Sequence, residues 1–140
     1  MATYRKQELP LEIPTECQMM WIAGFLEGEG CFCPMSGTDK RARISANQKQ
    51  REPLEKLLRW LGGRIYTSHT REMHIWMLRG EAAKILLPKL RPLMSPRRQG
   101  QIDKTLSAAF SVEHGSIERF RQKSMIRKQF IQAALSVAGG

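Results

Sequence analysis

The apolar residues of the chain alternate between helical spacing and short strand-like runs. A helix is expected to start near Glu16, because prolines interrupt the segment before it and Thr15 can form a capping box with Gln18. This helix is apolar nearly all round, which predicts burial on several sides, and Gly28 and Gly30 end it. The ordered part of the chain is therefore expected to open with a buried helix.

Two pairs of short runs predict β-hairpins. The runs 31–35 and 41–46 are divided by a Ser-Gly-Thr-Asp stretch, whose residue types are typical of turns. The runs 65–67 and 74–78 are rich in β-branched and aromatic residues and flank a second polar turn. Each hairpin is expected to follow a helix and precede another.

Helical spacing returns after each hairpin. The leucines between residues 54 and 61 predict an amphipathic helix that Gly62 and Gly63 end. After the second hairpin, helices are expected over 81–90 and from Ser95-Pro96 onwards. One side of the latter helix carries the apolar residues Ile102, Leu106, Ala109 and Phe110.

The charge of the chain points to a polyanionic partner. Its 140 residues, 41% of them apolar, fit one compact domain with a real core. Lys and Arg number 23 against 13 Asp and Glu, a formal net charge of +10 spread through most of the chain. A final basic helix is expected from residue 116 to about 135, and it can pack on the domain through Ile117, Phe120, Ile131 and Leu135.

Other classes of protein have little support. No stretch approaches the roughly 20 apolar residues of a membrane span, and the start of the chain lacks a secretory signal, so an intracellular protein without membrane contact is expected. The three cysteines are an odd number without Cys-x-x-Cys spacing, which argues against a disulfide framework or a structural zinc site.

Two acidic residues stand where helix electrostatics disfavours them. Glu27 and Glu29 lie at the C-terminal end of the apolar helix, where the helix dipole disfavours a carboxylate by up to ~1 kcal/mol. A divalent cation bound by carboxylate and carbonyl oxygens would reverse this preference; the alternative is that both glutamates are merely solvated. Gly24 and Gly28 share a helix face, so a second helix could approach closely and bring two Glu29 carboxylates around a metal.

Residues 22–30, Ile-Ala-Gly-Phe-Leu-Glu-Gly-Glu-Gly, resemble the signature nonapeptide of the LAGLIDADG homing endonucleases. The order of elements over about 16–110 is similar to that family as well, although Glu replaces the commoner Asp at both acidic positions. The resemblance implies an α+β fold of order αββαββα, in which the two hairpins form a saddle-shaped antiparallel sheet that lies in the DNA major groove.

The resemblance also implies the residues of an active site. Glu29, with the carbonyl of Gly28, is expected to hold Mg²⁺ or Mn²⁺ for phosphodiester hydrolysis. Gln48 matches a polar active-site position of the family. Arg98, with Arg97 as the alternative, stands where family members often have a lysine. One motif per chain implies a homodimer with Trp21, Gly24 and Gly28 at its interface.

The strands suggest which residues meet double-stranded DNA. Arg41 and Arg43 alternate with apolar residues, which predicts a basic strand face that includes Ser45. Cys33 and Met35 should share that orientation, as DNA contacts or as packing adaptors. In the second hairpin the register stays open: the groove-facing set is either Thr67, His69, Ile75 and Met77 or Tyr66, Ser68, His74 and Trp76.

We therefore expect an N-terminal extension over 1–14, a LAGLIDADG endonuclease domain over 15–110 and a basic C-terminal helical extension over 111–140. The expected function is cleavage of a long, roughly palindromic DNA site, the activity behind intron or intein mobility. The alternatives are a cleavage-inactive DNA-binding regulator and an RNA-splicing maturase, and retention of the proposed site residues argues against them. A non-enzymatic basic protein would explain the charge but not the nonapeptide.

Overall fold

The chain folds as helices and two hairpins in the predicted order. A computed structural model describes residues 7–10, 13–37, 40–70, 72–112, 131–132 and 135. Its elements are α1 (Glu16–Glu29), β1 (Gly30–Pro34), β2 (Ala42–Gln48), α2 (Glu52–Leu61), β3 (Arg64–Ser68), β4 (Met73–Arg79), α3 (Glu81–Leu90), the short 3-10 helix η1 (Arg91–Leu93) and α4 (Pro96–Val112). The predicted α+β class and the αββαββα order are confirmed.

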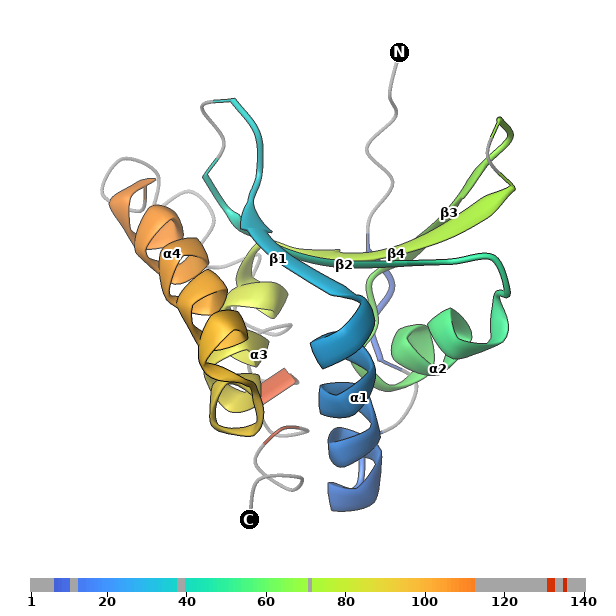
Figure 1. Cartoon of the computed structure of the whole chain (residues 1–140), viewed down its shortest axis with the longest axis horizontal. Helices are drawn as coiled ribbons and strands as arrows, with labels where there is room; N and C mark the ends of the chain where they lie inside the picture. Colours follow the sequence, from blue (N-terminus) through green and yellow to red (C-terminus); the bar gives the residue numbers. More distant parts are fainter. Residues whose placement is uncertain are drawn as a thin grey trace.

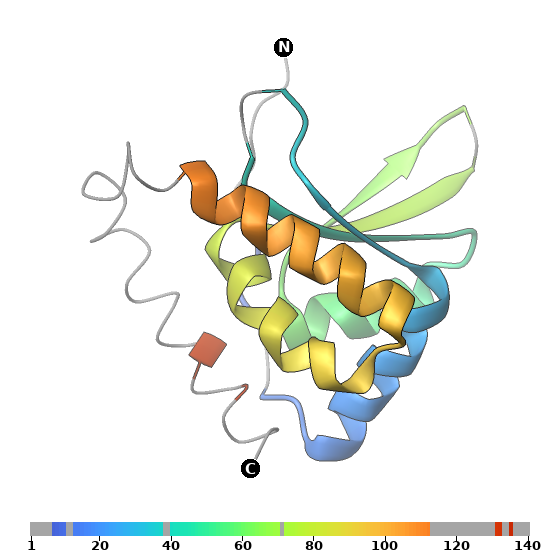
Figure 2. The ribbon, with the colours of Figure 1, turned by 60° about the vertical axis from the view of Figure 1, so that its left-hand side comes forward.

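The strands form one antiparallel sheet in the order β1-β2-β4-β3, so the second strand of each hairpin lies in the centre. Helices α1, α2, α3 and α4 all lie on one side of the sheet, and the tips of both hairpins curve away from that side (Figure 1). The turned view shows α3 and α4 stacked side by side next to β1 and β2 (Figure 2). The helices therefore cover one face of the sheet, and within the described residues no helix covers the other face (Figure 1).

The core lies between the helices and the covered face. Thr15 and Gln18 form the predicted capping box, which starts α1. From α1, Ile22 and Leu26 are fully buried, and the sheet contributes Ile44 and Trp76. Apolar residues of the other helices complete this core: Leu54, Leu57, Leu61, Ala82, Ala83, Leu86, Leu87, Leu90 and Ile102.

The end of α2 is fixed by close backbone contacts. The indole Nε1 of Trp76 donates to the carbonyl of Gly62 over 2.9 Å. Gly63 has φ +99°, and a Cβ there would come within 2.5 Å of the Met77 carbonyl oxygen, so only glycine fits. Gly63 also exchanges two backbone hydrogen bonds with Glu8, which attaches the N-terminal segment to the sheet. The predicted stop at these glycines is thus confirmed.

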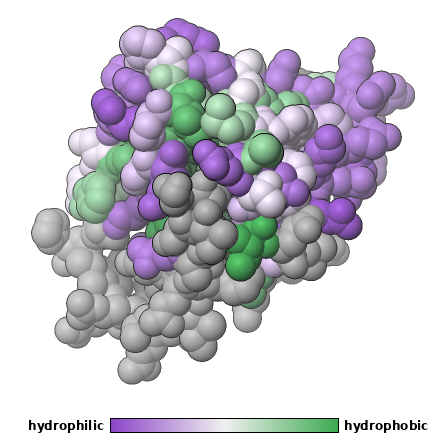
Figure 3. Space-filling model, turned by 90° about the horizontal axis from the view of Figure 1, so that it is seen from below, coloured by the Kyte–Doolittle hydropathy of each residue, from purple (hydrophilic) through white to green (hydrophobic). Residues whose placement is uncertain are grey.

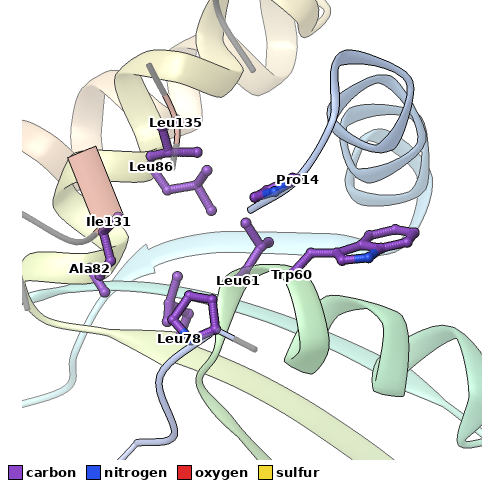
Figure 4. A pocket seen from close by; sticks show the side chains of 9 residues that line it. Pro14, Trp60, Leu61, Leu78, Ala82, Leu86, Ile131 and Leu135 are labelled. Carbon is purple, nitrogen blue, oxygen red and sulfur yellow. The ribbon is translucent and has the colours of Figure 1, made fainter. Parts of the chain in front are cut away.

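An apolar crevice lies where both ends of the chain meet the domain. Figure 4 shows Pro14 beside Trp60 of α2, while Ile131 and Leu135 approach α3 from the other side. Both C-terminal residues are buried, as predicted, whereas Ile117 and Phe120 lie outside the described residues. Ile131 and Leu135 therefore line the same crevice as Pro10 and Pro14.

The apolar side expected on the helix after Ser95-Pro96 is only partly buried. Phe110 is 53% exposed and lies under the Lys84 ammonium at 4.3 Å. Thr105 is fully buried instead, because its hydroxyl donates to the Gln101 carbonyl over 2.8 Å and so carries no unsatisfied donor into the core. The buried side of α4 therefore excludes Phe110, which the apolar pattern includes, and contains Thr105 instead.

The predicted burial of α1 on several sides is also only partly right. Met20 is 58% exposed, Gly24 and Gly28 are exposed, and Trp21 and Phe25 are half-buried. Seen from the helix side, apolar patches reach the surface among polar ones (Figure 3). Within the described residues, no helix is long and apolar enough to cross a membrane.

Candidate metal centre and nucleic-acid interface

The strand face away from the helices carries a continuous set of side chains. Residues that pair across antiparallel strands point to the same side, and side chains alternate along each strand. Since Phe32, Ile44 and Trp76 are buried on the helix side, the alternate positions point away from the helices. We call this the open face, and it consists of Cys31, Cys33, Arg43, Ser45, Asn47, Arg64, Tyr66, Ser68, Met73, Ile75, Met77 and Arg79.

Strand pairing fixes the faces of the second hairpin, and each predicted set is half right. Ile75 and Met77 of one set and Tyr66 and Ser68 of the other lie on the open face. Tyr66 pairs with Ile75, so even-numbered residues of β3 share a side with odd-numbered residues of β4. Trp76 turns inward because its indole needs the Gly62 carbonyl. His69, predicted as a DNA contact, lies in the exposed turn after β3 rather than on a strand.

The first hairpin follows the predicted alternation. Arg43 and Ser45 lie on the open face between buried neighbours. Arg41 and Met35 lie just beyond the strand ends, where the Met35 N–H donates to the Arg41 carbonyl over 2.8 Å and continues the ladder. Cys33 is half-buried beside Arg43. All five predicted residues therefore belong to this hairpin, with two of them at its tip.

Positive charge collects on the open face. The four strands contain three arginines and no acidic residue. Arg43 lies directly opposite Arg79, a like-charge pair that disfavours the sheet. Among the described residues, the Nε atoms of Arg43 and Arg64 are buried without a hydrogen-bond partner. A bound anion would relieve the repulsion and could supply acceptors, which suits a phosphate backbone.

Five open-face residues were not predicted from the sequence, namely Cys31, Asn47, Arg64, Met73 and Arg79. The alternation of Trp76 and Leu78 as inward residues was the signal that places Arg79 outward, but a one-residue slip of β4 could not be excluded without its partners. The N-terminal segment also binds the end of β4 that carries Arg79. The Gln7 side-chain amide bonds both the N–H and the carbonyl of Arg79, at 2.6 and 2.8 Å, where β3 no longer reaches β4.

The acidic end of α1 separates its two glutamates into different environments. The Glu27 carboxylate accepts hydrogen bonds from the Ser95 backbone N–H at 2.5 Å and from the Ser95 hydroxyl at 3.0 Å. The Ser95 N–H lowers the pKa of Glu27 below its ordinary 4.5, against a smaller effect of desolvation, and the hydroxyl, Arg98 and Arg97 act with it. Glu27 therefore caps the start of α4 and has a structural partner.

Arg98 reinforces the same junction from inside the protein. It is only 6% exposed, and its Nε donates to the Glu27 carbonyl over 3.0 Å. Its guanidinium lies 5.5 Å above the Phe32 ring and donates to Gln101 over 2.9 Å. Arg97, the alternative basic position, is exposed. The structure thus places the predicted basic residue at the end of α1, where it binds protein groups.

Glu29 and Gly28 are exposed, unlike Glu27. Glu29 is the last residue of α1, and Gly30 is both the cap of this helix and the first residue of β1. Gln48 lies at the end of β2, two residues beyond the partner of Gly30, half-buried on the helix side opposite His74. The candidate catalytic residues therefore gather where α1, β1 and β2 meet.

The donor set at this junction fits a hard divalent cation. Carboxylate and carbonyl oxygens are the ligands such ions prefer. The Leu26 and Glu27 carbonyls accept from Gly30 and Arg98, so the Gly28 carbonyl is the next along the helix. Apart from the α1 backbone and the adjacent residues, no atom of the described residues lies within 4 Å of the position that a Gly28 Cβ would occupy. In the described part of the chain, no three His, Cys, Asp or Glu side chains form a metal-holding group.

An aromatic and glycine-rich side of α1 faces outward. Trp21 stacks on Phe25 with ring centroids 5.1 Å apart and meets Trp60 edge-on at 5.6 Å. The Lys56 ammonium lies 4.8 Å from the Trp21 ring. Gly24 has no neighbouring atom within 4 Å of a Cβ position. The predicted interface residues thus share one exposed side of the helix.

Solved structures with a similar fold are homing endonucleases. The structure of I-CvuI in complex with the I-CreI target in the presence of Mg has a TM-score of 0.61 and 16% identity, and the match covers 85% of this chain and 82% of that chain. The archaeal intron-encoded homing endonuclease I-Vdi141I complexed with DNA has a TM-score of 0.59 and 18% identity, over 88% and 95% of the two chains. I-TnaI has a TM-score of 0.54 and 18% identity, over 81% and 84%.

Comparison of the sequence with protein-family models and with curated proteins finds no match. The structural similarity confirms the fold that the resemblance to the LAGLIDADG family implies. The chain has the fold of the homing endonucleases.

The capping role of Glu27 predicts a pH-dependent effect of its replacement. Because the folded state lowers the pKa of Glu27, its contribution to stability is present above pH 4.5 and is lost as the pH falls through the lowered value. Glu27→Gln should therefore lower Tm by a few degrees at pH 7. The difference from the unchanged protein should shrink in acid.

Thermal unfolding followed by circular dichroism from pH 7 to pH 3 measures this difference. Glu72→Gln, in the exposed turn before β4, is the matched control and should change Tm little at any pH. A Glu27→Gln effect of equal size at neutral and acidic pH would contradict a role for the ionised carboxylate.

Proposed function

We propose that this protein is a site-specific, divalent-metal-dependent DNA endonuclease that acts as a homodimer on a long, roughly palindromic site. One observation carries the proposal: the exposed carboxylate of Glu29 stands at the residue where α1 passes into β1, the edge strand of the basic open face. The basic open face, which suits a polyanion, and the Glu29 carboxylate, which suits a metal ion, therefore lie next to each other in the fold. The DNA-bound homing endonucleases with this fold support the assignment.

DNA binding is assigned to the open face. A two-stranded ribbon or curved sheet fits the major groove, where arginine can bond guanine and small apolar groups can contact the thymine methyl. Arg43 and Arg79 supply the first kind of contact, and Ile75 and Met77 supply the second. Met35 and Arg41 extend this surface to the hairpin tip. The positive charge binds phosphates, and the side chains between the arginines select the sequence.

Cleavage is assigned to the end of α1. Glu29 and the Gly28 carbonyl would hold Mg²⁺ or Mn²⁺, which when bound activates water and neutralises charge on the phosphate. Gln48 is placed to orient a water or a phosphate oxygen from the end of β2. Arg98 acts as a positioning residue in this proposal, because its guanidinium binds the Glu27 carbonyl and holds the helix end.

The homodimer is supported by the outward side of α1. Glycine within a helix costs about 1 kcal/mol relative to alanine, and neither Gly24 nor Gly28 is required by a neighbour within the chain. Close approach of a second helix would give both glycines a role. A two-fold contact through α1 would also cover Met20 and the ring of Phe25 and bring two Glu29 residues to the centre of the assembly.

Replacement of Glu29 is expected to reduce DNA cleavage without reducing DNA binding. Glu29→Gln removes the charged metal ligand but keeps a side chain of the same shape, so folding and specific DNA binding should persist. Mg²⁺-dependent cleavage of the preferred site should fall about 100-fold or more. Gel-resolved cleavage rates and binding in Ca²⁺ measure the two effects, with Glu16→Gln as the remote carboxylate control. Cleavage at the unchanged rate would exclude Glu29 from the site.

Replacement of Arg43 tests the open face. Arg43→Ala should cost about 1 to 3 kcal/mol of binding to the preferred site and relax selection at particular base pairs. Lys104→Ala, which removes an exposed charge from α4, should leave base selection unchanged. Selection from a randomised DNA library at fixed salt compares them. Equal, sequence-independent losses from both variants would show that Arg43 does not read bases.

Replacement of Gly24 tests the dimer. Because nothing within the chain lies near a Gly24 Cβ, Gly24→Leu should leave the single-chain fold intact while it separates the two helices. The variant should be monomeric and inactive, with an unchanged circular dichroism spectrum. Gly100→Leu, at an equally open position on α4, is the control. Sedimentation velocity reports the mass, and an active Gly24→Leu dimer would refute this interface.

A further inference from the structure

Two cysteine side chains lie together on the open face, where the proposed function gives them no chemical role. Cys31 and Cys33 are two residues apart on β1 and therefore point to the same side of the strand. Their sulfur atoms are 3.9 Å apart. Cys31 is exposed and Cys33 is half-buried, so both can be reached from solvent. The pair forms a short dithiol at the edge of the sheet.

Side chains of the neighbouring strand hold both thiols in place. The Arg43 Nη2 donates to the Cys33 sulfur over 2.9 Å. Burial and the neighbouring Cys33 raise the pKa of the Cys31 thiol, against the smaller lowering effects of Arg43 and of the hydrogen bond from the Ser45 side chain. These partners lie directly opposite the two cysteines in the β1–β2 register. Hydrogen bonds to a metal-bound thiolate orient the ligand and offset its negative charge. The two sulfurs are therefore positioned by the fold.

We propose that Cys31 and Cys33 form a two-thiolate binding site for a thiophilic metal ion such as Zn²⁺ or Cd²⁺. Metal–sulfur bonds of about 2.3 Å that span the observed 3.9 Å enclose an angle of about 116° at the metal, close to the tetrahedral value. Water completes the coordination on the exposed side. Soft sulfur ligands distinguish this site from the oxygen donors of Glu29 and Gly28, which suit hard cations.

The geometry favours chelation over a disulfide between the same residues. Two residues of a strand span about 6.4 to 6.8 Å, at the upper limit of the Cα separation that a disulfide tolerates. A disulfide would also require the sulfurs to approach to about 2.05 Å, from 3.9 Å. A bridging metal ion needs no such movement.

A metal ion at this site would affect DNA binding. It would sit beside Arg43 and Ser45, on the surface that the proposed function assigns to the major groove. Zn²⁺ or Cd²⁺ should therefore weaken DNA binding, because the ion and its water ligands occupy the space of the base edges. This consequence rests on the proposed function, whereas ion binding itself does not.

Titration of the full chain with Cd²⁺ tests the site, with no DNA and no Mg²⁺ present. The unchanged protein should bind about one ion per chain and develop the ultraviolet sulfur-to-cadmium charge-transfer band. Cys31→Ser and Cys33→Ser should each lower the affinity by at least about tenfold and reduce the band. Cys17→Ser is the matched control, because Cys17 is the third cysteine and lies in the first turn of α1; it should behave like the unchanged protein.

Several outcomes would overturn the site. These are a band that persists in both Cys31→Ser and Cys33→Ser, a band that disappears in Cys17→Ser, and saturation without any band. Alanine replacements repeat the test if a serine variant fails to fold by circular dichroism.

A second measurement follows binding of the preferred DNA with and without Cd²⁺. Weaker binding in the unchanged protein and in Cys17→Ser, but not in Cys31→Ser, supports both proposals. If the band requires both thiols but Cd²⁺ does not change DNA binding, the result supports the ion site and contradicts the open face as the DNA surface.

Discussion

The carboxylate of Glu27 joins the end of α1 to the start of α4, and the rest of the site depends on this junction. Ser95 donates to it twice, and Arg98 bonds the Glu27 carbonyl from below while it covers Phe32 of β1. The negative end of one helix dipole thereby meets donors from the start of another, which offsets the cost of an acidic residue there. At Gly30 the chain passes directly from α1 into β1, and Glu29 is exposed at this junction.

The second constraint is the inward orientation of Trp76. Its hydrogen bond to the Gly62 carbonyl closes the end of α2 and fixes the register of β4. Since sides alternate along a strand, this one residue sets Ile75, Met77 and Arg79 on the open face. Arg79 then lies directly opposite Arg43, and the positive charge of this face suits a polyanion.

Much of the architecture could be predicted from local patterns. The capping box at Thr15, the turn residues and the glycine pair after α2 each have a short-range physical cause, and the nonapeptide indicated the fold of the homing endonucleases. The faces of the second hairpin could not be predicted, because they depend on how β3 pairs with β4, and Tyr66 meets Ile75 only in three dimensions. The different environments of Glu27 and Glu29 could not be predicted either, because Ser95, the hydrogen-bond partner of Glu27, is 68 residues away in the sequence.

In the proposed function, a pair of these chains cuts DNA at the ends of their α1 helices. Selection of cleaved molecules from a randomised double-stranded DNA library, with Mg²⁺ and with a chelator, measures this activity. We expect cleavage only with Mg²⁺, at one long sequence whose two halves are related by approximate two-fold symmetry. Binding of such a sequence without cleavage under either condition, as for a DNA-binding regulator, would contradict the proposed function.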